Sequence, residues 1–349
     1  MVYNSSMRTK TFLLPLVLAL AGGTFAFGQP AGPRVIIVGV DGLSVDALRT
    51  ARAPRLHEFM PRAAWTLEAR GVMPTLSSPN WASAINGAAP EQHGITSNGY
   101  LRRKVEFRPV CRTADGTFPT IFGLLRAEHP AARIAVFHDW DGFADLLEKR
   151  VPDVMRHVPG ADQTTRAAID YWTANQPDLM FIHLDNVDHA GHAHGWFSRQ
   201  YYEAVEAADG YVGQVLDMID RLQARTSTFV LVTSDHGGTR HGHGKNSLEE
   251  IQIPWIFAGP GVTPGQIGAP VNTFDTALTV AWIFHLDAPT CWIGRPVLAA
   301  FSPSLVTAHD GALRGMPPDC APNRQLAGAA STLQLEKSSL GGIHAGQAN

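Results

Sequence analysis

Continuous apolar runs alternate along this chain with segments in which apolar residues recur at helical spacing. Such runs are typical of strands buried on both faces of a parallel sheet. The runs are Val35–Val40, Ile134–Phe137, Leu179–Leu184, Phe229–Thr233 and Ile253–Ala258. The expected helices are Ser44–Leu56, Ser78–Ile85, Phe118–Glu128, Thr164–Gln176, Arg199–Ala224 and Thr276–His285. The alternation predicts an α/β fold with a doubly wound, mostly parallel sheet and helices on both faces.

The N-terminus has the pattern of a secretory signal. Arg8 and Lys10 precede a mostly apolar stretch, residues 11–27. We expect residues 1–28 to be a signal peptide, which makes the mature protein periplasmic or secreted. A membrane anchor is the alternative, but the stretch is short and interrupted by Pro15. No later stretch is long enough to span a bilayer, so no stable span is expected after signal cleavage.

The remainder reads as one catalytic domain and a tail. We expect the domain to occupy residues 29–316, with a small loop or cap region near 96–160. Residues 95–117 have the character of a surface loop or small hairpin. Residues 317–349 are rich in Ala, Gly, Ser and Gln, a composition that predicts disorder.

Composition and charge narrow the class of function. The 349 residues are 45% hydrophobic and 17% charged, with a net charge of -3. Removal of residues 1–28, which hold two basic residues and no acidic one, leaves 26 basic and 31 acidic residues, a net charge of -5. This balance gives no sign of a nucleic-acid polymer as partner. It does not indicate an oligomeric state.

The chain has three cysteines, and none has metal-ligand spacing to another. Export permits a disulfide, and if two of them pair we expect Cys291 with Cys320. At least one cysteine, for example Cys111, then stays unpaired. A metal site in this chain would therefore use histidines and carboxylates.

Asp41 closes the first apolar run and is followed by Gly42. Open parallel sheets bind ligands at the carboxyl ends of their strands, so a carboxylate here is a candidate ligand. The alternative is that Asp41 caps the helix that follows.

Ser77 stands in the segment Pro74–Asn80, immediately before an expected helix. A hydroxyl bound to a metal has a lowered pKa and becomes a nucleophile. The alternative is that Ser77 or Ser78 only caps the helix.

Asp188 and His192 follow the run Leu179–Leu184. We expect them to lie on a turn and reach one cation. The neighbouring His183, His189 and His194 are expected to be hydrogen-bonded or solvated, and Asp185 is an alternative ligand.

Asp235 and His236, in Ser234-Asp-His-Gly237, form the most specific segment because they follow the cleanest strand pattern in the chain. Successive side chains at a strand end diverge, so two adjacent ligands can face two different metals. His241 or His243 would complete the first metal site, and the glycines on both sides favour His243. The alternative is a polar turn.

Together these segments resemble the nucleotide pyrophosphatase/phosphodiesterase-like branch of the alkaline phosphatase superfamily. The resemblance covers most of residues 34–298. It depends on Pro74-Thr-Leu-Ser-Ser-Pro-Asn80, Pro90-Glu-Gln-His-Gly-Ile95, Asp188 to His192 and Ser234 to Gly237.

The resemblance implies two divalent metal ions, with zinc favoured, in an alkaline-phosphatase-like fold. Asp188, His192 and His243 would hold one ion. Asp41, Asp235 and His236 would hold the other, with Ser77 beside it. Asn98 matches an asparagine that donates to a phosphoryl oxygen, although an Asn before Gly99 is also a common turn pair.

Three departures from the family pattern bear on the substrate. The nucleophile is Ser where this branch usually has Thr. The last metal-binding histidine follows Ser-Asp-His-Gly directly instead of lying far downstream. The stretch between Asn98 and Asp188 has no room for the long insert with which some related phosphomonoesterases grip a dianionic phosphate.

The sequence therefore predicts a two-metal hydrolase that cleaves small-molecule phosphate esters through a phosphoseryl intermediate, as phosphodiesterases and nucleotide pyrophosphatases do. The first alternative is an alkaline-type phosphomonoesterase, for which extra cationic contacts are needed; Arg102, Arg103, Lys104 and Lys245 are the candidates. A sulfatase is disfavoured because Trp81 stands where Arg is required. A metal-binding protein without catalysis is the remaining alternative. The candidates for stacking on a nucleobase or an apolar leaving group are Trp81, Tyr100, Trp140 and Trp196, and the alternative is that they belong to the core.

Overall fold

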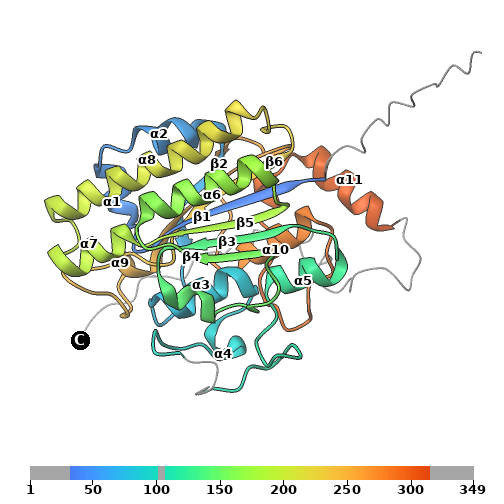
Figure 1. The fold of residues 1–349 in the computed structure, drawn as a ribbon, viewed down its shortest axis with the longest axis horizontal. Coiled ribbons are helices and arrows are strands. Elements are labelled where there is room, and N and C mark those ends of the chain that lie inside the picture. Colours follow the sequence, from blue (N-terminus) through green and yellow to red (C-terminus); the bar gives the residue numbers. More distant parts are fainter. Residues whose placement is uncertain (1–31, 101–106, 315–349) are drawn as a thin grey trace, which may run out of the picture. The chain divides into compact units, whose positions relative to one another are not determined.

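The computed structural model describes residues 32–100 and 107–314, whose strands form one eight-stranded sheet in the order β4-β3-β5-β1-β6-β7-β2-β8 (Figure 1). The strands are β1 (Arg34–Val40), β2 (Ala64–Arg70), β3 (Ile134–His138), β4 (Val154–His157), β5 (Leu179–Leu184), β6 (Thr228–Thr233), β7 (Gln252–Ala258) and β8 (Gly265–Gln266). Only β7 runs antiparallel to its neighbours, and every other pairing within these ranges is parallel. The predicted mostly parallel sheet is confirmed.

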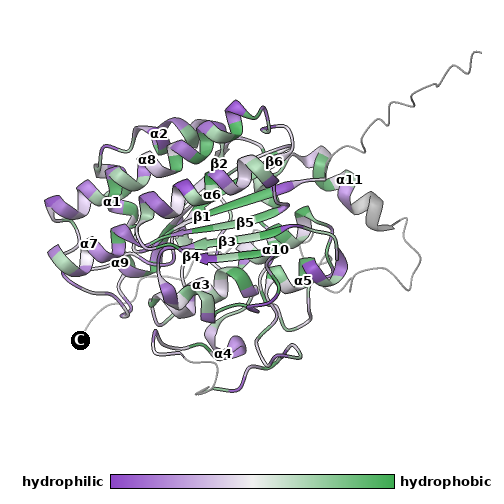
Figure 2. Ribbon diagram, viewed as in Figure 1, coloured by the Kyte–Doolittle hydropathy of each residue, from purple (hydrophilic) through white to green (hydrophobic). Residues whose placement is uncertain are grey.

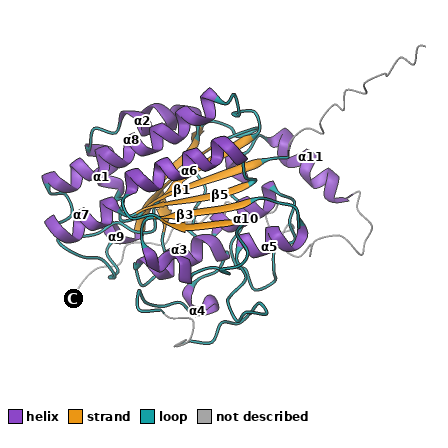
Figure 3. Cartoon of the chain, viewed as in Figure 1, coloured by secondary structure: helices purple, strands orange, loops and turns teal. Residues whose placement is uncertain are grey.

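Helices cover both faces of the sheet, as predicted (Figure 3). One face packs against α1 (Val45–Thr50), α2 (Pro54–Phe59), α6 (Ala161–Asn175) and α8 (Arg199–Arg221). The other packs against α3 (Ser77–Asn86), α5 (Ile121–Glu128) and α10 (Asp275–Ile283). In β1 Ile36 and Val38 belong to the first core and Val35 and Ile37 to the second. The central strands therefore carry mostly apolar side chains on both faces (Figure 2).

Shorter helices complete the described part of the chain. They are α4 (Pro90–His93), α7 (Asn186–His194), α9 (Leu248–Ile251), α11 (Pro303–Arg314) and the 3₁₀ helices η1 (Met60–Arg62), η2 (Asp141–Asp145) and η3 (Leu298–Ala300). No helix within residues 32–100 and 107–314 is both long and apolar enough to cross a bilayer.

Two expectations about local structure need correction. The expected helix Ser44–Leu56 is divided into α1 and α2, because Pro54 begins a new helix and the preceding Ala53 is not helical, as is typical of a residue before proline. The segment with Asp188 and His192, expected as a turn, is the helix α7. Its i, i+4 spacing places both side chains on one helix face.

Several expectations fall on segments that the structure does not describe: the signal peptide 1–28, the tail 317–349 and the basic residues Arg102, Arg103 and Lys104. Residues 96–160, expected to hold a small cap, include α5, β3, η2 and β4. Of these, β3 and β4 belong to the central sheet.

Cys111 and Cys291 form a disulfide with a Cα–Cα distance of 6.3 Å. The expected pairing of Cys291 with Cys320 is therefore wrong, and Cys320 lies outside the described residues. The partners are 180 residues apart in the sequence. Only the packed fold brings the loop after α4 beside the segment that follows α10.

Candidate metal centre

The candidate residues follow three adjacent central strands, at the carboxyl ends of those strands. In the order β5-β1-β6, Asp41 follows β1, α7 follows β5, and Asp235 follows β6 (Figure 1). Because these strands are parallel, their carboxyl ends meet at the same edge. The topology therefore brings together side chains that lie nearly 200 residues apart in the sequence.

The first group consists of Asp41, Asp235 and His236, whose side chains are at most 1% exposed. One ligand atom from each lies within 4.8 Å of the others. His236 Nε2 is 3.1 Å from Asp235 Oδ2 and 3.5 Å from Asp41 Oδ1. The Ser77 hydroxyl is 3.2 Å from the same nitrogen. The hydroxyl expected to be the nucleophile thus lies beside this group.

The second group consists of Asp188, His192 and His243. His243 Nε2 lies 3.6 Å from Asp188 Oδ1 and 3.1 Å from His192 Nε2, which is 3.4 Å from Asp188 Oδ2. The His236 and His243 rings stack with centroids 3.6 Å apart, so the two groups adjoin. The His192 side chain is 47% exposed. This side of the centre therefore opens to solvent, whereas the first group is enclosed.

Each of the histidines His192, His236 and His243 has its Nδ1 against a backbone carbonyl. The carbonyl partners are those of His241 for His192 (3.0 Å), Gly237 for His236 (2.8 Å) and Thr75 for His243 (2.7 Å). A carbonyl oxygen only accepts hydrogen bonds, so Nδ1 carries the proton in each ring. In the neutral rings the Nε2 atoms, which face the carboxylates and one another, are bare. Ligand histidines are held in this way by their second nitrogen.

The carboxylates present unpaired oxygens to these nitrogens. Within the described residues, Asp41 Oδ1, Asp188 Oδ1 and Asp235 Oδ2 are buried and have no hydrogen-bond partner. Acceptors that face acceptors are unfavourable in a buried site unless a cation lies between them. Imidazole nitrogens and carboxylate oxygens are the ligands that zinc and similar divalent ions take in proteins. The residues present thus fit divalent metal ions.

The pKa shifts of the residues in the centre also favour the binding of cations. Burial, with the charges of Asp41 and Asp185, raises the pKa of Asp188 to about 9. Burial and the charges of Asp41 and Asp188 raise the pKa of Asp235 well above its usual value. Burial lowers the pKa of His236 to about 3, and the neighbouring His243 adds to this. A cluster that cannot ionise all its carboxylates alone would bind cations strongly.

Asp41 differs from the other carboxyls of the centre. Burial opposes its ionisation, but hydrogen bonds from His183 and Trp81 and the charges of His236 and His183 outweigh burial and lower its pKa. His183 Nε2 lies 3.0 Å and Trp81 Nε1 2.8 Å from Asp41 Oδ2. Both contacts use one oxygen and leave Oδ1 free to face the centre.

His183 was expected to be hydrogen-bonded rather than a ligand, and the structure places it against a candidate ligand. It lies on β5 and is fully buried. The signal in the sequence is a single polar residue within the apolar run Leu179–Leu184. The contact of Trp81 with Asp41 has no such signal, because a tryptophan in a helix usually serves the core.

Asp185, weighed as an alternative ligand, also lies near the centre. Oxygens of Asp41, Asp185 and Asp188 lie within 4.8 Å of one another. Burial, followed by the charge of Asp41, raises the pKa of Asp185 to about 7. Its backbone N–H donates to Asp139 Oδ2 at 3.2 Å.

Gly42 allows α7 to approach β1. It has a φ of 70°, and a Cβ there would lie 2.7 Å from the Cα atom of Asp188. Its N–H donates to Asp235 Oδ1 at 3.1 Å. A side chain at position 42 would therefore separate the two carboxylates of the centre.

Ser77 is the first residue of α3, and the N-cap residue is Leu76. The interpretation of Ser77 as a simple cap is therefore not what the structure shows. Asn80 holds the preceding loop: its Oδ1 accepts from Val72 N at 2.6 Å, and its Nδ2 lies 3.0 Å from the Leu76 carbonyl. Asn98 Oδ1 accepts from Ser78 N at 2.9 Å, which leaves its amide NH₂ as the donor side of the group.

His93, from the segment Pro90–Ile95, supports the same helix. Its Nδ1 accepts from Ile95 N at 3.1 Å, so its Nε2 carries the proton and donates to Ser83 Oγ at 3.1 Å. The ring is buried, and burial lowers its pKa to about 3. His93 thus acts as a neutral structural link between α4 and α3.

The structure distinguishes His241 from His243. The His241 ring has its Nδ1 3.3 Å from the carbonyl oxygen of His192, away from the carboxylates. His192 Nδ1 in turn lies 3.0 Å from the His241 carbonyl oxygen. His243, which is 3% exposed, faces Asp188. The geometry therefore brings His243 into the group and gives His241 a supporting place.

Two of the aromatic residues considered for stacking on a leaving group are buried in the fold. Trp81 is fully buried, and Trp196 is 5% exposed. The Trp196 indole packs edge-on against His192 and donates through Nε1 to the Gly42 carbonyl at 3.2 Å. These rings support the centre and do not present a free face.

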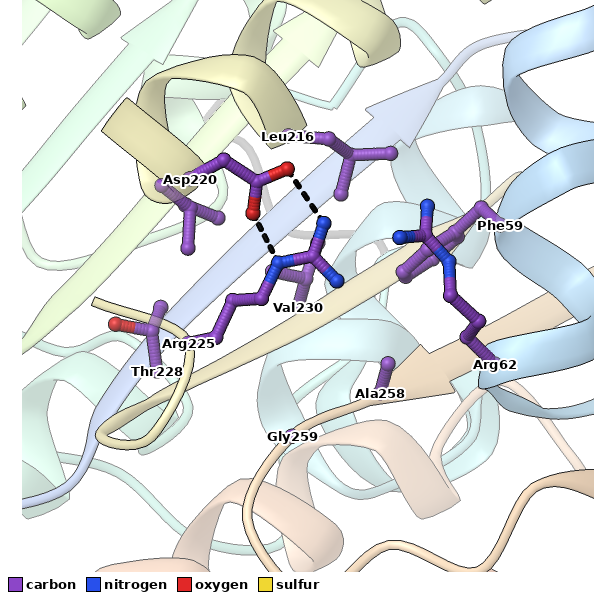
Figure 4. A pocket seen from close by; sticks show the side chains of 10 residues that line it. Phe59, Arg62, Leu216, Asp220, Arg225, Thr228, Val230, Ala258 and Gly259 are labelled. Carbon is purple, nitrogen blue, oxygen red and sulfur yellow. Dashed lines mark hydrogen bonds and ion pairs between the residues drawn. The ribbon is translucent and has the colours of Figure 1, made fainter. Parts of the chain in front are cut away.

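Figure 4 shows a cavity of about 180 Å³. It lies at the end of the sheet opposite to the centre. It is lined by the first residue of β6, Thr228, and the last residue of β7, Ala258, whereas the candidate ligands follow the other end of β6. Arg225 forms an ion pair with Asp220 at its wall. None of the candidate site residues lines this cavity.

Comparisons with known proteins agree with this architecture. The family model described as type I phosphodiesterase / nucleotide pyrophosphatase matches residues 35–251. Ectonucleotide pyrophosphatase/phosphodiesterase family member 1 of Rattus norvegicus is 24% identical over 223 residues, 59% of this chain and 24% of the relative. GPI ethanolamine phosphate transferase 1 of Saccharomyces cerevisiae is 24% identical over 274 residues, 72% of this chain and 30% of the relative. The chain thus spans less than a third of the length of these relatives.

Solved structures show the same fold. Inactive murine ectonucleotide pyrophosphatase/phosphodiesterase 5, in complex with AMP, superposes with a TM-score of 0.65 at 16% identity, over 77% of this chain and all of the other. The alkaline phosphatase PafA superposes with a TM-score of 0.64 at 12% identity, over 79% of this chain and all of the other. The fold is therefore alkaline-phosphatase-like.

Proposed function

Because this chain belongs to the type I phosphodiesterase / nucleotide pyrophosphatase family, we propose that it is a two-metal hydrolase that cleaves small-molecule phosphate diesters through a phosphoseryl intermediate. The observation that carries the proposal is the Ser77 hydroxyl, which lies 3.2 Å from His236 Nε2 within the cluster of candidate ligands. Sequence relatives named for pyrophosphatase and phosphodiesterase activity support the substrate class.

The donor set suggests which residues would hold the ions. Asp41, Asp235 and His236 would hold the ion beside Ser77. Asp188, His192 and His243 would hold the second, and zinc is the proposed metal. When bound, such ions lower the pKa of a hydroxyl nucleophile and stabilise the leaving oxygen.

The protein groups then act in sequence. Ser77 Oγ attacks phosphorus and gives up its proton, the bond from phosphorus to the leaving oxygen breaks, and that oxygen takes up a proton and departs as an alcohol. Water next attacks phosphorus in this intermediate, the bond to Ser77 Oγ breaks, and a phosphate monoester leaves while the Ser77 hydroxyl is restored. Asn98, held by its bond to Ser78 N, would donate through Nδ2 to a phosphoryl oxygen. Positioning and preorganised donors of this kind supply most of the catalysis in phosphoryl transfer.

Transfer to an alcohol is the second candidate, because one relative is an ethanolamine phosphate transferase that matches 72% of this chain. The phosphoseryl intermediate would be the same, with an alcohol in place of water in the second step. Product analysis in the presence of ethanolamine would show which acceptor is used.

The test compares three substrates with and without added zinc: bis-nitrophenyl phosphate, nitrophenyl phosphate and nitrophenyl sulfate. We expect zinc-dependent cleavage of the diester above the monoester and no sulfate cleavage. Ser77→Ala should abolish turnover, and Ser77→Thr, which keeps a hydroxyl, should retain it. Preference for the monoester would make the protein a phosphomonoesterase. Full activity of Ser77→Ala would overturn the mechanism.

A further inference from the structure

Glu250 is a fully buried carboxylate that accepts hydrogen bonds from two separate loops. Its Oε2 lies 2.5 Å from Lys245 N and 2.9 Å from the Thr75 hydroxyl. Its Oε1 accepts from the Thr239 hydroxyl at 3.2 Å. A buried carboxylate is costly unless donors surround it, and the donors here come from both sides of the candidate centre.

Thr75 connects this carboxylate to the centre. Its carbonyl accepts from His243 Nδ1 at 2.7 Å, and its hydroxyl oxygen accepts from Gly244 N at 2.9 Å. The hydroxyl hydrogen is shared between Glu250 and the Lys245 carbonyl, which lies 2.7 Å away. Thr75 stands two residues before Ser77 in the loop that presents the nucleophile. One residue thus touches both the candidate ligand His243 and the nucleophile's own segment.

We propose that Glu250 is a positioning residue that fixes the distance between Ser77 and the metal group containing His243. The inference rests on the proposed function. Glu250 ties the loop 239–245 to the loop before α3, and through Thr75 it keeps His243 with its proton on Nδ1 and its bare Nε2 toward Asp188. Contacts of this kind to a ligand's second nitrogen set its orientation and basicity.

The two carboxylate oxygens of Glu250 accept from three donors, the hydroxyls of Thr75 and Thr239 and the Lys245 N–H. Glutamine would keep one acceptor oxygen and place an NH₂ group against the hydroxyls or the Lys245 N–H. At least one donor in this buried site would then lose its partner. The nucleophile loop and the His243 loop would separate or shift, while the group of Asp41, Asp235 and His236 would keep its own contacts.

The test is Glu250→Gln, with Glu249→Gln as the matched control. Glu249 is the adjacent residue on α9, and its side chain is exposed. Metal-free protein is titrated with zinc in competition with a chromophoric chelator. For Glu250→Gln we expect one of the two ions to bind about 10- to 100-fold more weakly and the other to bind as in the wild type. The visible absorption of the cobalt-substituted protein should change in Glu250→Gln and remain that of the wild type in Glu249→Gln.

Kinetics give a second measurement. With saturating zinc and the diester substrate, kcat of Glu250→Gln should fall by about tenfold or more while KM stays within about twofold, because the substrate contacts are retained. If Glu250→Gln does not fold, the pair Thr75→Val and Thr75→Ser replaces it. Valine removes the hydroxyl but keeps the carbonyl and the shape. Thr75→Val should therefore lower the affinity for the same ion more than Thr75→Ser does.

The outcomes separate this inference from the proposed function. Two ions bound with wild-type affinity and an unchanged kcat in a folded Glu250→Gln would overturn the positioning role alone. A wild-type protein that binds two ions but cleaves no ester would overturn the proposed function, and the shift in metal affinity would still support the role of Glu250. A wild-type protein that binds no divalent ion would overturn both.

Discussion

The Nε2 atoms of His192 and His243 lie 3.1 Å apart and face each other as bare acceptors. Each ring is held in that orientation because its Nδ1 donates to a backbone carbonyl, that of His241 for His192 and that of Thr75 for His243. Two unprotonated nitrogens at this distance repel unless a cation or a proton lies between them. This arrangement is the strongest structural argument that the second group is built for a metal ion.

His192→Ala should therefore lose one of two bound zinc ions. We expect its affinity for that ion to fall by more than the roughly 10- to 100-fold typical of an outer contact. His189→Ala is the control, because His189 is an exposed histidine on the same helix. Zinc stoichiometry, measured by elemental analysis after dialysis, should fall from two to one only in His192→Ala. Equal stoichiometry in both variants would contradict the assignment of His192.

His241→Ala should have a smaller effect than His243→Ala. His241 contacts His192 reciprocally, through its carbonyl at 3.0 Å and its ring at 3.3 Å, and alanine keeps the carbonyl. We expect at most about a tenfold loss of zinc affinity for His241→Ala and loss of the ion for His243→Ala. Calorimetric titration of metal-free protein measures both. The reverse order would make His241 the ligand.

Trp81→Phe should lower both the stability of the fold and the zinc affinity of the group formed by Asp41, Asp235 and His236. The indole N–H donates to Asp41 Oδ2 at 2.8 Å, and a hydrogen bond to a charged group contributes about 1.5–3 kcal/mol. The control is Trp172→Phe, because the buried Trp172 Nε1 has no hydrogen-bond partner in the described structure. Urea unfolding of metal-free protein should show the larger loss for Trp81→Phe, and only this variant should bind zinc more weakly. Equal losses would assign Trp81 to packing alone.

Asn98→Ala should slow catalysis without changing metal affinity. Its Oδ1 is occupied by Ser78 N, so the amide NH₂ is the group available to a phosphoryl oxygen. Removal of one preorganised donor typically costs about 10²–10³ in kcat. Steady-state kinetics on the diester measure this loss, and Asn98→Ser, which offers a shorter donor, should recover part of it. An unchanged kcat in Asn98→Ala would mean that Asn98 has only a structural role in its turn.

The sequence predicted the sheet well because its central strands are unusual in composition. Runs such as Val35–Val40 are apolar on both faces, a pattern that strands at the centre of a covered parallel sheet require. The strands that were not predicted, β2, β4 and β8, are short or lie toward the edges of the sheet, where one side is exposed and the pattern weakens. The antiparallel direction of β7 depends on its neighbours and not on its own residues.

The residues of the centre also fall into those that the sequence predicts and those that it does not. Segments such as Asp235-His236 carry their own signal, because two adjacent ligand-type side chains directly after a buried strand are typical of a binding site. The contacts that orient the ligands come from elsewhere: Trp81 holds Asp41, and Glu250 holds the loop of His243 through Thr75. Nothing in the sequence distinguishes these partners from other helix and loop residues. Only the folded chain places their polar atoms against the centre.

His93 should make the stability of the metal-free protein depend on pH. Its pKa is about 3 in the folded protein, because burial disfavours the charged ring, and about 6.5 when unfolded. Between these values the unfolded chain binds one more proton than the folded chain. Stability from this group is therefore complete above about pH 6.5 and is lost as the pH falls toward about 3. The slope is about 1.4 kcal/mol per pH unit in the middle of this window.

His93→Gln cannot titrate, so its free energy of unfolding, measured in urea from about pH 7 to about pH 4.5, should fall less steeply than that of the wild type by about this amount. Other titrating groups contribute equally to both proteins and cancel in the difference. Parallel curves would mean that the pKa of His93 is the same in the folded and the unfolded protein. A ring that takes up a proton in the folded protein would carry hydrogens on both nitrogens, so Nδ1 could not accept from Ile95 N.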